Sequence, residues 1–200
     1  MDERVRNSWE SFLNPDVLRP NLVMAALYIA AFELLKSEIV ERIREFYITG
    51  FDSNADRDDG WLVDPMYQMQ VLSRNRSKVY ASLDWLKESQ AIDDRDIAVF
   101  ERAKTCRNDV AHRINQMLSK GLPADLPDRF ADIVALVDKI ARWWVVNVEI
   151  PTNPDFDGEE IDEAGIVPGS TMGLRLLIDI ALGSDKESRF YINEFLRRTG

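Results

Sequence analysis

The strongest constraint on the fold is an apolar pattern that has the period of an α-helix. Across residues 22–47, apolar side chains recur at intervals of three and four, which gathers them on one face of a helix and leaves charged residues on the other. The most apolar part, residues 22–35, is interrupted by Glu33 and is shorter than the about 20 residues that span a bilayer. We therefore expect a long buried helix here and not a membrane anchor.

Three further segments have the same period and recognisable boundaries. Asp64 followed by proline is typical of an N-cap and first turn, and opens a helical stretch over residues 65–90 that has a break near the SRNRS sequence. A third helix begins near residues 93–100 and ends before Gly121, and a fourth covers residues 127–148. No stretch alternates apolar and polar residues for long enough to predict a sheet.

The composition changes after Ile150. Residues 151–165 are acidic and contain no Lys or Arg, which predicts an exposed loop. Helical periodicity resumes near residues 172–182, and the spacing of Ser184 and Glu187 is that of a capping box that opens a last helix. We therefore predict an all-α chain. Its parts are a helical bundle of four main helices over residues 1–150, an acidic loop over 151–168, and a C-terminal helical extension over 169–200 that packs on the same domain.

The overall charge limits the classes of partner. A net charge of −10 argues against a protein that coats nucleic acid non-specifically, because that needs Lys and Arg in excess over a whole face. The charged N-terminus lacks the apolar segment of a signal peptide. The single cysteine, Cys106, allows no internal disulfide and fits a reducing compartment; its ordinary role is that of a small buried residue. We expect a cytoplasmic protein with no membrane association.

One short motif stands apart from these structural patterns. The only histidine of the chain, His112, follows Arg107 by five positions in the sequence RNDVAH. On a helix, Asn108 and His112 share a face, whereas Arg107 starts about 140° away from His112. One helix therefore does not make the site compact, but a symmetric dimer would bring the same patch together from two chains.

These residue types suit phosphate chemistry. Histidine can accept and donate a proton near neutral pH, and arginine can hold phosphate oxygens and stabilise developing charge. Asn108 could bind a phosphate oxygen or fix the imidazole tautomer. The alternative is structural: Asn108 and His112 form hydrogen bonds between helices, while Arg107 and Asp109 form surface ion pairs, Asp109 with Arg113. As a bare pattern, the motif does not decide between the two.

In this helical context the chain resembles the HEPN family of small helical bundles, whose motif is an arginine, a following polar residue and a histidine spaced as Rx4–6H. Residues 107–112 match the shortest spacing, and the resemblance covers roughly residues 20–150. It implies a homodimer with both motifs at the interface and, in active members, metal-independent cleavage of RNA by the ribose 2′-hydroxyl. By this resemblance His112 is the acid/base group, Arg107 the phosphate clamp and Asn108 a supporting contact.

The same resemblance implies a toxin of a toxin-antitoxin pair or an effector of phage defence, with an antitoxin or nucleotidyltransferase as partner. It also implies a polar residue that points inward from the first helix, for which Glu33 is the candidate; the alternative for Glu33 is an ion pair with an Arg or Lys of a neighbouring helix. Local positive charge marks where RNA phosphates would bind. The residues concerned are Arg102, Lys104, Arg113, Arg74, Arg76 and Lys78, although the last three also fit a solvated helix break.

No cofactor or metal site is expected. The chain has no glycine-rich phosphate loop and no second histidine. The NPDFDG sequence at 153–158 resembles the start of a calcium loop but has Ala164 where a glutamate is needed. The rival to the ribonuclease is a catalytically inactive helical module that binds a protein partner or a nucleotide.

Overall fold

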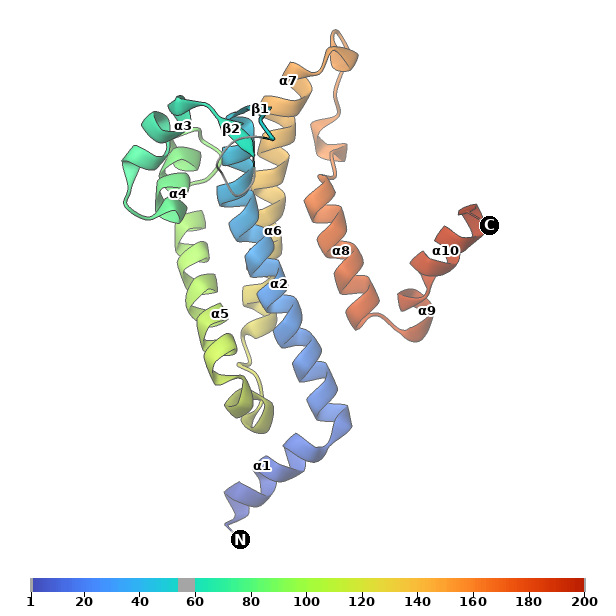
Figure 1. Cartoon of the computed structure of the whole chain (residues 1–200). Helices are drawn as coiled ribbons and strands as arrows, with labels where there is room; N and C mark the ends of the chain where they lie inside the picture. The colour runs from blue at the N-terminus through green and yellow to red at the C-terminus, as the bar shows by residue number, and fades with distance from the viewer. Residues whose placement is uncertain (1, 54–59, 200) are drawn as a thin grey trace.

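The computed structural model describes residues 2–53 and 60–199, and these are predominantly helical, so the all-α prediction is confirmed. The elements are α1 (Glu3–Leu13), α2 (Pro15–Phe46), β1 (Ile48–Phe51), β2 (Trp61–Val63), α3 (Pro65–Gln70), η1 (Leu72–Arg74), α4 (Lys78–Glu88), α5 (Asp94–Lys120), α6 (Leu126–Trp144), η2 (Val145–Glu149), α7 (Ile150–Thr152), η3 (Pro154–Phe156), η4 (Glu163–Gly165), α8 (Gly169–Leu182), α9 (Asp185–Ser188) and α10 (Phe190–Thr199). The long helices α2, α5 and α6 run side by side, with α4 near one end and α1 crossing the other (Figure 1).

The core lies between α2, α4, α5 and α6. Fully buried residues include Leu35 and Ile39 of α2, Leu86 of α4, Val110 of α5 and Ile140 of α6. The predicted periodicity of α2 is confirmed by this burial, but the helix starts earlier than expected. Asn14 caps it by accepting a hydrogen bond from the backbone of Asp16 (3.0 Å), and a proline in the first turn fits such a start.

Several predicted boundaries are also confirmed. Asp64 caps α3 and accepts from the Met66 backbone at 2.8 Å, and the SRNRS segment separates α3 from α4. Gly121 follows α5 with φ 94°, a left-handed backbone conformation that favours glycine. Ser184 and Glu187 form the predicted capping box of α9.

A short antiparallel pair of strands corrects the prediction of a polar loop after α2. β1 and β2 pair with Ile48 opposite Val63 and Phe51 opposite Trp61. The strands have only four and three residues, too few to give a readable alternation. The rest of that loop, residues 54–59, lies outside the described residues.

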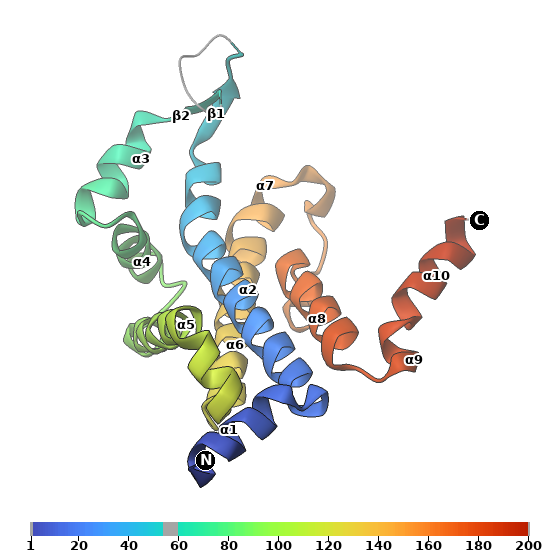
Figure 2. The same ribbon diagram turned by 60° about the horizontal axis from the view of Figure 1, so that its bottom comes forward.

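The last three helices form a C-terminal arm, defined here as α8, α9 and α10. α8 packs on α2 and α6 through the buried Thr171 and Leu174. α9 and α10 then turn back and stand off from the long helices, with α8 between (Figure 2). No described residue of α9 or α10 is buried.

One segment of the described residues has the length and composition that would allow it to cross a membrane, Glu163–Leu182. Its continuous helix, α8, has only 14 residues, whereas about 20 are needed to span a bilayer. Length and composition are therefore weak grounds for a membrane span at this place.

Candidate functional site

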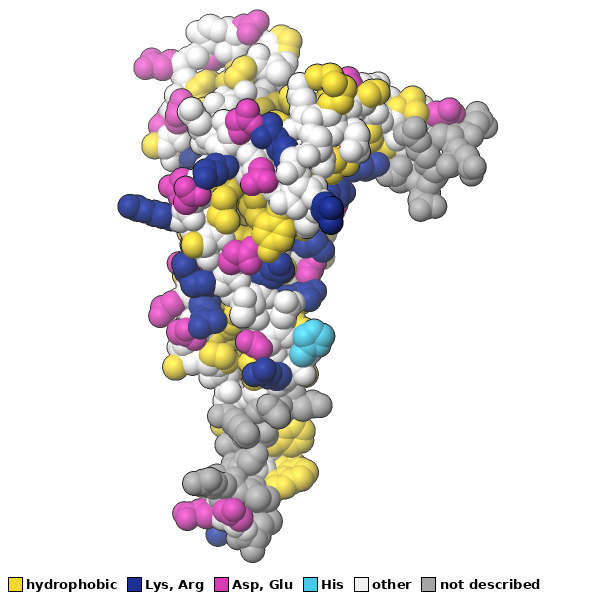
Figure 3. All heavy atoms as spheres, turned by 90° about the vertical axis from the view of Figure 1, so that its left-hand side faces the viewer, with side chains coloured by type: hydrophobic (Ala, Val, Ile, Leu, Met, Phe, Trp, Pro, Cys, Tyr) yellow, Lys and Arg dark blue, Asp and Glu magenta, His cyan; other side chains and the backbone are white. Residues whose placement is uncertain are grey.

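The RNDVAH motif lies in the second half of α5. Arg107 is partly buried, whereas Asn108 and His112 are exposed. The histidine, drawn in cyan, stands at the edge of the face that Figure 3 presents. Arg113, directly after it, has non-helical backbone angles (φ −118°, ψ 20°) that kink α5. The motif therefore ends at a bend of the helix, with the imidazole accessible to solvent.

Arg107 is held by neighbours on two helices. Its Nη2 donates to Glu33 Oε1 of α2 at 2.6 Å, and its Nη1 donates to Asn108 Oδ1 at 3.3 Å. The guanidinium carbon lies 5.9 Å from the centre of the Phe32 ring. The Nε atom is buried and has no hydrogen-bond partner among the described residues. These contacts fix the guanidinium plane while leaving one of its donors without an acceptor.

Glu33 forms an ion pair with Arg107 of a neighbouring helix, which was the alternative to a catalytic role for this residue. The Glu33 carboxylate also forms a second ion pair, with Lys36 Nζ at 3.5 Å, one turn further along α2. The side chains of Arg107 and Glu33 are 32% and 42% exposed, so the pair contributes only about 0.2–1 kcal/mol to stability. Its main effect is to orient the arginine.

A hollow of about 250 Å³ opens beside this pair, between α2, α4 and α5. Its floor is apolar and its rim is charged, which fits the hydrophobic side chains bordered by charged ones in Figure 3. The lining residues are Phe32, Glu33, Lys36, Ser77, Val79, Tyr80, Phe100, Lys104, Arg107 and Asn108. The hollow thus brings together Glu33, Lys104, Arg107 and Asn108, four of the residues singled out from the sequence. His112 is not among its lining residues.

Lys104 and Tyr80 form a second pair at the hollow. Lys104 Nζ donates to the Tyr80 hydroxyl at 2.7 Å and lies 4.8 Å from the centre of the ring. This hydrogen bond raises the pKa of Lys104 above its ordinary value, so the amine stays charged beside the hollow. The lining contains three cationic side chains and one carboxylate, in a chain whose net charge is −10.

The other basic candidates lie elsewhere and are mostly paired. Arg74 forms an ion pair with Glu88, and Lys78 one with Glu41. Arg102 lies 3.8 Å from Asp132, and Arg113 lies 3.7 Å from Asp109. The second pair is the one expected if the motif has a structural role. Arg76 is exposed. Of the six basic residues named from the sequence as candidates for RNA binding, only Lys104 lines the hollow.

Three lining residues carry no signal in the sequence. Tyr80 and Lys36 belong to no motif, and Phe32 has the helical period of a core residue. They come together only because α2, α4 and α5 pack against one another. A contact between residues so far apart in the chain could not be read from local spacing.

Two further expectations from the sequence concern Cys106 and metal binding. Cys106 is buried and free, as expected for a small core residue. Within residues 2–53 and 60–199, no group of three His, Cys, Asp or Glu side chains is placed to hold a metal ion. The NPDFDG segment forms the short helix η3 and a turn at Gly158.

The geometry therefore consists of an oriented arginine, an exposed histidine one helical turn from Asn108, and a cationic hollow with an apolar floor. Comparison of the chain with models of protein families, with curated proteins and with solved structures finds no match.

Proposed function

We propose that this chain is a HEPN-like, metal-independent endoribonuclease that acts as a homodimer, with Arg107, Asn108 and His112 of both protomers in one cleft. By the resemblance of its motif, it serves as a toxin of a toxin-antitoxin pair or as a phage-defence effector. The observation that carries the proposal is the setting of RNDVAH on α5: Arg107 is oriented by Glu33, and His112 is exposed on the same helix. A buried, fully paired histidine would have favoured a purely structural role.

The reaction needs a base, an acid and a positive charge at the phosphate. In the proposed step His112 of one protomer removes the proton of a ribose 2′-hydroxyl, and the 2′-oxygen attacks the adjacent phosphorus. The bond from phosphorus to the 5′-oxygen breaks, and His112 of the second protomer returns a proton to that oxygen. Arg107 stabilises the charge on the phosphate oxygens. The products carry a 2′,3′-cyclic phosphate and a 5′-hydroxyl, so atoms and protons balance.

Two histidines are required because one imidazole cannot be both the free base and the protonated acid in the same step. A single chain has only His112, which is why the proposal includes a symmetric dimer. The exposure of His112 and Asn108 leaves this face of α5 accessible to a second copy.

The experiment is cleavage of total RNA by the purified protein in excess EDTA. The wild type is expected to cut and to leave 2′,3′-cyclic phosphate ends, whereas His112→Ala and Arg107→Ala are expected to lose about 10²–10⁴-fold in rate. Arg95→Ala is the matched control, because Arg95 is exposed at the opposite end of α5 and should cut at the wild-type rate. Circular dichroism checks that each variant is folded.

Two results would overturn the proposal: no cleavage by the wild type, or equal cleavage by wild type and His112→Ala. The dimer is tested separately by mixing the wild type with an excess of folded His112→Ala protein. Because the proposed cleft needs His112 from both chains, mixed dimers hold only one histidine and are expected to be inactive, so the activity per wild-type chain should fall as the variant is added.

A second candidate function is a helical module that binds a protein partner, and the C-terminal arm favours it. Met172, Leu177, Ile180, Phe190 and Phe195 of the arm are all exposed, and contiguous exposed apolar side chains often mark binding surfaces. Co-expression with the product of a neighbouring antitoxin or nucleotidyltransferase gene tests it. Leu177→Ser with Ile180→Ser should abolish a stable complex and leave RNA cleavage by the free protein unchanged.

A further inference from the structure

The hollow beside Arg107 has features that the cleavage step does not use. The step needs only the phosphate, the 2′-hydroxyl and the leaving oxygen. Tyr80, Phe32 and Lys36 line the hollow without contributing to that chemistry. Their aromatic and aliphatic surfaces are suited to a ligand group other than the phosphate itself.

We propose that this hollow is a nucleotide subsite that receives the base of one of the two nucleotides flanking the scissile phosphate of single-stranded RNA. The position relative to the cut rests on the proposed function; the recognition of a base does not. The class of ligand is a planar heterocycle joined to a phosphate, held by Tyr80 and the apolar floor on one side and by the cationic rim on the other.

The volume and the lining of the hollow fit the ring system of a single nucleobase. Its volume of about 250 Å³ is below the range of about 300–1,000 Å³ typical of sites for larger ligands. Phe32 and Phe100 stack at 5.7 Å beneath it, and Tyr80 forms a partly exposed aromatic wall. Proteins that bind single-stranded RNA place unstacked bases against such aromatic side chains.

The charged rim matches the rest of a nucleotide. Lys36, Lys104 and Arg107 surround the hollow with a single carboxylate, Glu33, so anionic oxygens are attracted to its edge. The Arg107 side chain lines the hollow and is 32% exposed, and its guanidinium can donate to a ligand oxygen or ring nitrogen. The Glu33 carboxylate can accept from N–H groups on the edge of a base.

The hollow also lies next to the RNDVAH motif along α5. Arg107 and Asn108 belong both to the motif and to the lining, and His112 follows Asn108 by four residues, about 6 Å along the helix axis. A phosphate held by the Arg107 guanidinium therefore lies at the edge of the hollow, next to the base that the hollow would receive. Arg107 and Asn108 thus link the proposed base subsite to the proposed cleavage site.

The test uses a 2′-O-methyl RNA dinucleotide, which has two bases and one phosphate but no hydroxyl that can attack. Two further dinucleotides each lack one base. Titration by calorimetry or NMR should show that removing one particular base weakens binding to the wild type by about 5- to 150-fold, the range that one base–aromatic contact provides. Removing the other base should have a smaller effect.

The variants assign this effect to the hollow. Tyr80→Ala, and Tyr80→Leu as a second variant that keeps an apolar side chain and protects the fold, should abolish the difference between the intact and the abasic dinucleotide. Phe156→Ala is the matched control, because Phe156 is an exposed aromatic residue in the acidic loop and should preserve the difference. Circular dichroism confirms that the variants are folded.

The outcomes separate this inference from the proposed function. If both abasic dinucleotides bind the wild type as tightly as the intact one, or if the Tyr80 variants keep the difference, the subsite is wrong even where RNA is cut. If RNA is not cut but binding depends on one base and on Tyr80, the ribonuclease is wrong and the hollow stands as a nucleotide site.

Discussion

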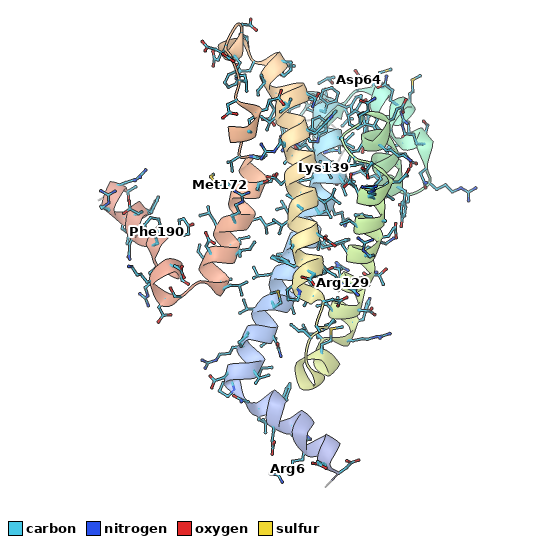
Figure 4. The ribbon with its side chains drawn as sticks, turned by 180° about the vertical axis from the view of Figure 1, so that it is seen from behind. Arg6, Asp64, Arg129, Lys139, Met172 and Phe190 are labelled. Carbon is cyan, nitrogen blue, oxygen red and sulfur yellow. The ribbon has the colours of Figure 1, made fainter. Side chains whose placement is uncertain are left out.

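The three long helices and the C-terminal arm use the same kinds of apolar side chain in opposite ways. In α2, α5 and α6, residues such as Leu35, Ile39 and Ile140 are completely buried. In the arm, only the inner face of α8 is covered, and large apolar residues of its outer face and of α10 are exposed. These are Met172, Leu177, Ile180, Leu182, Phe190, Ile192, Phe195 and Leu196; Met172 and Phe190 are labelled in Figure 4.

This difference teaches that apolar periodicity alone does not identify a core. Both regions have helical periodicity, but in the arm only the inner face of α8 has neighbours, whereas the apolar faces of the long helices are covered. The stability of the chain should therefore reside in α2, α5 and α6, while the arm contributes little beyond the contact of α8. The predictions below test this contrast, beginning with the largest expected effect.

The largest effect is expected from a cavity in the core. Leu35→Ala removes a side chain that is 0% exposed and should lower the free energy of unfolding by about 2–5 kcal/mol. The matched change in the arm is Leu177→Ala, at a side chain that is 51% exposed, with an expected effect within about 0.5 kcal/mol. Urea unfolding followed by circular dichroism measures both. Equal losses would mean that the outer face of α8 is covered in solution, and the contrast would fail.

The second prediction concerns the border between the two regions. Glu38 of α2 is buried, and burial raises the pKa of its carboxyl above the ordinary value, against the opposing effect of Arg42. Because the folded state holds the proton more tightly than the unfolded state, the contribution of Glu38 to stability is greatest at acid pH and is lost as the pH rises through the raised pKa. Glu38→Gln removes this dependence.

We therefore expect the wild type to gain stability relative to Glu38→Gln as the pH falls from about 7 to about 4, by about 1.4 kcal/mol for each unit by which the pKa is raised. Urea unfolding at the two pH values measures the difference. Asp185→Asn, at an exposed residue of α9, controls for a general effect of removing one carboxylate. A relative loss of stability at acid pH would mean that the Arg42 ion pair dominates and that the pKa is lowered.

The third prediction compares two tyrosine hydroxyls. Tyr28 of α2 is fully buried and donates to the Ala103 carbonyl of α5 at 3.3 Å, so Tyr28→Phe should cost about 0.5–1.5 kcal/mol. Tyr191 of α10 donates to Asp179 of α8 at 2.7 Å, at the surface, and Tyr191→Phe should cost less. Thermal unfolding of the two variants ranks them. The reverse order would place the arm, and not α2 with α5, at the centre of stability.

Much of the fold could be predicted from the sequence because its signals are local. The caps at Asp64 and Ser184 and the periodicity of α2 each involve residues within a turn or two of one another. The prediction failed where local signals are weak. The strands β1 and β2 are too short to alternate, and the kink at Arg113 has no proline or glycine to mark it.

The candidate site was predictable only along one helix. The spacing of Asn108 and His112 follows from the helical repeat, whereas the ion pair of Arg107 with Glu33 joins residues 74 positions apart. Glu33 could be named as a polar residue in an apolar helix, but its partner depends on how α2 packs on α5. The hollow depends on three helices at once, so Tyr80 and Lys36 were beyond any argument from spacing.

The smallest effect is expected from removing α10. Truncation after Ser188 deletes a helix of ten residues, none of them buried, so the free energy of unfolding should change by no more than about 0.5 kcal/mol. A helix this short is marginal in water on its own, and the Tyr191 hydrogen bond to Asp179 is one contact that ties it to α8. Truncation should therefore lower the helical signal in circular dichroism slightly without shifting the unfolding transition. A loss as large as that of Leu35→Ala would show that α10 packs against the long helices in solution, and the contrast between the two regions would have to be abandoned.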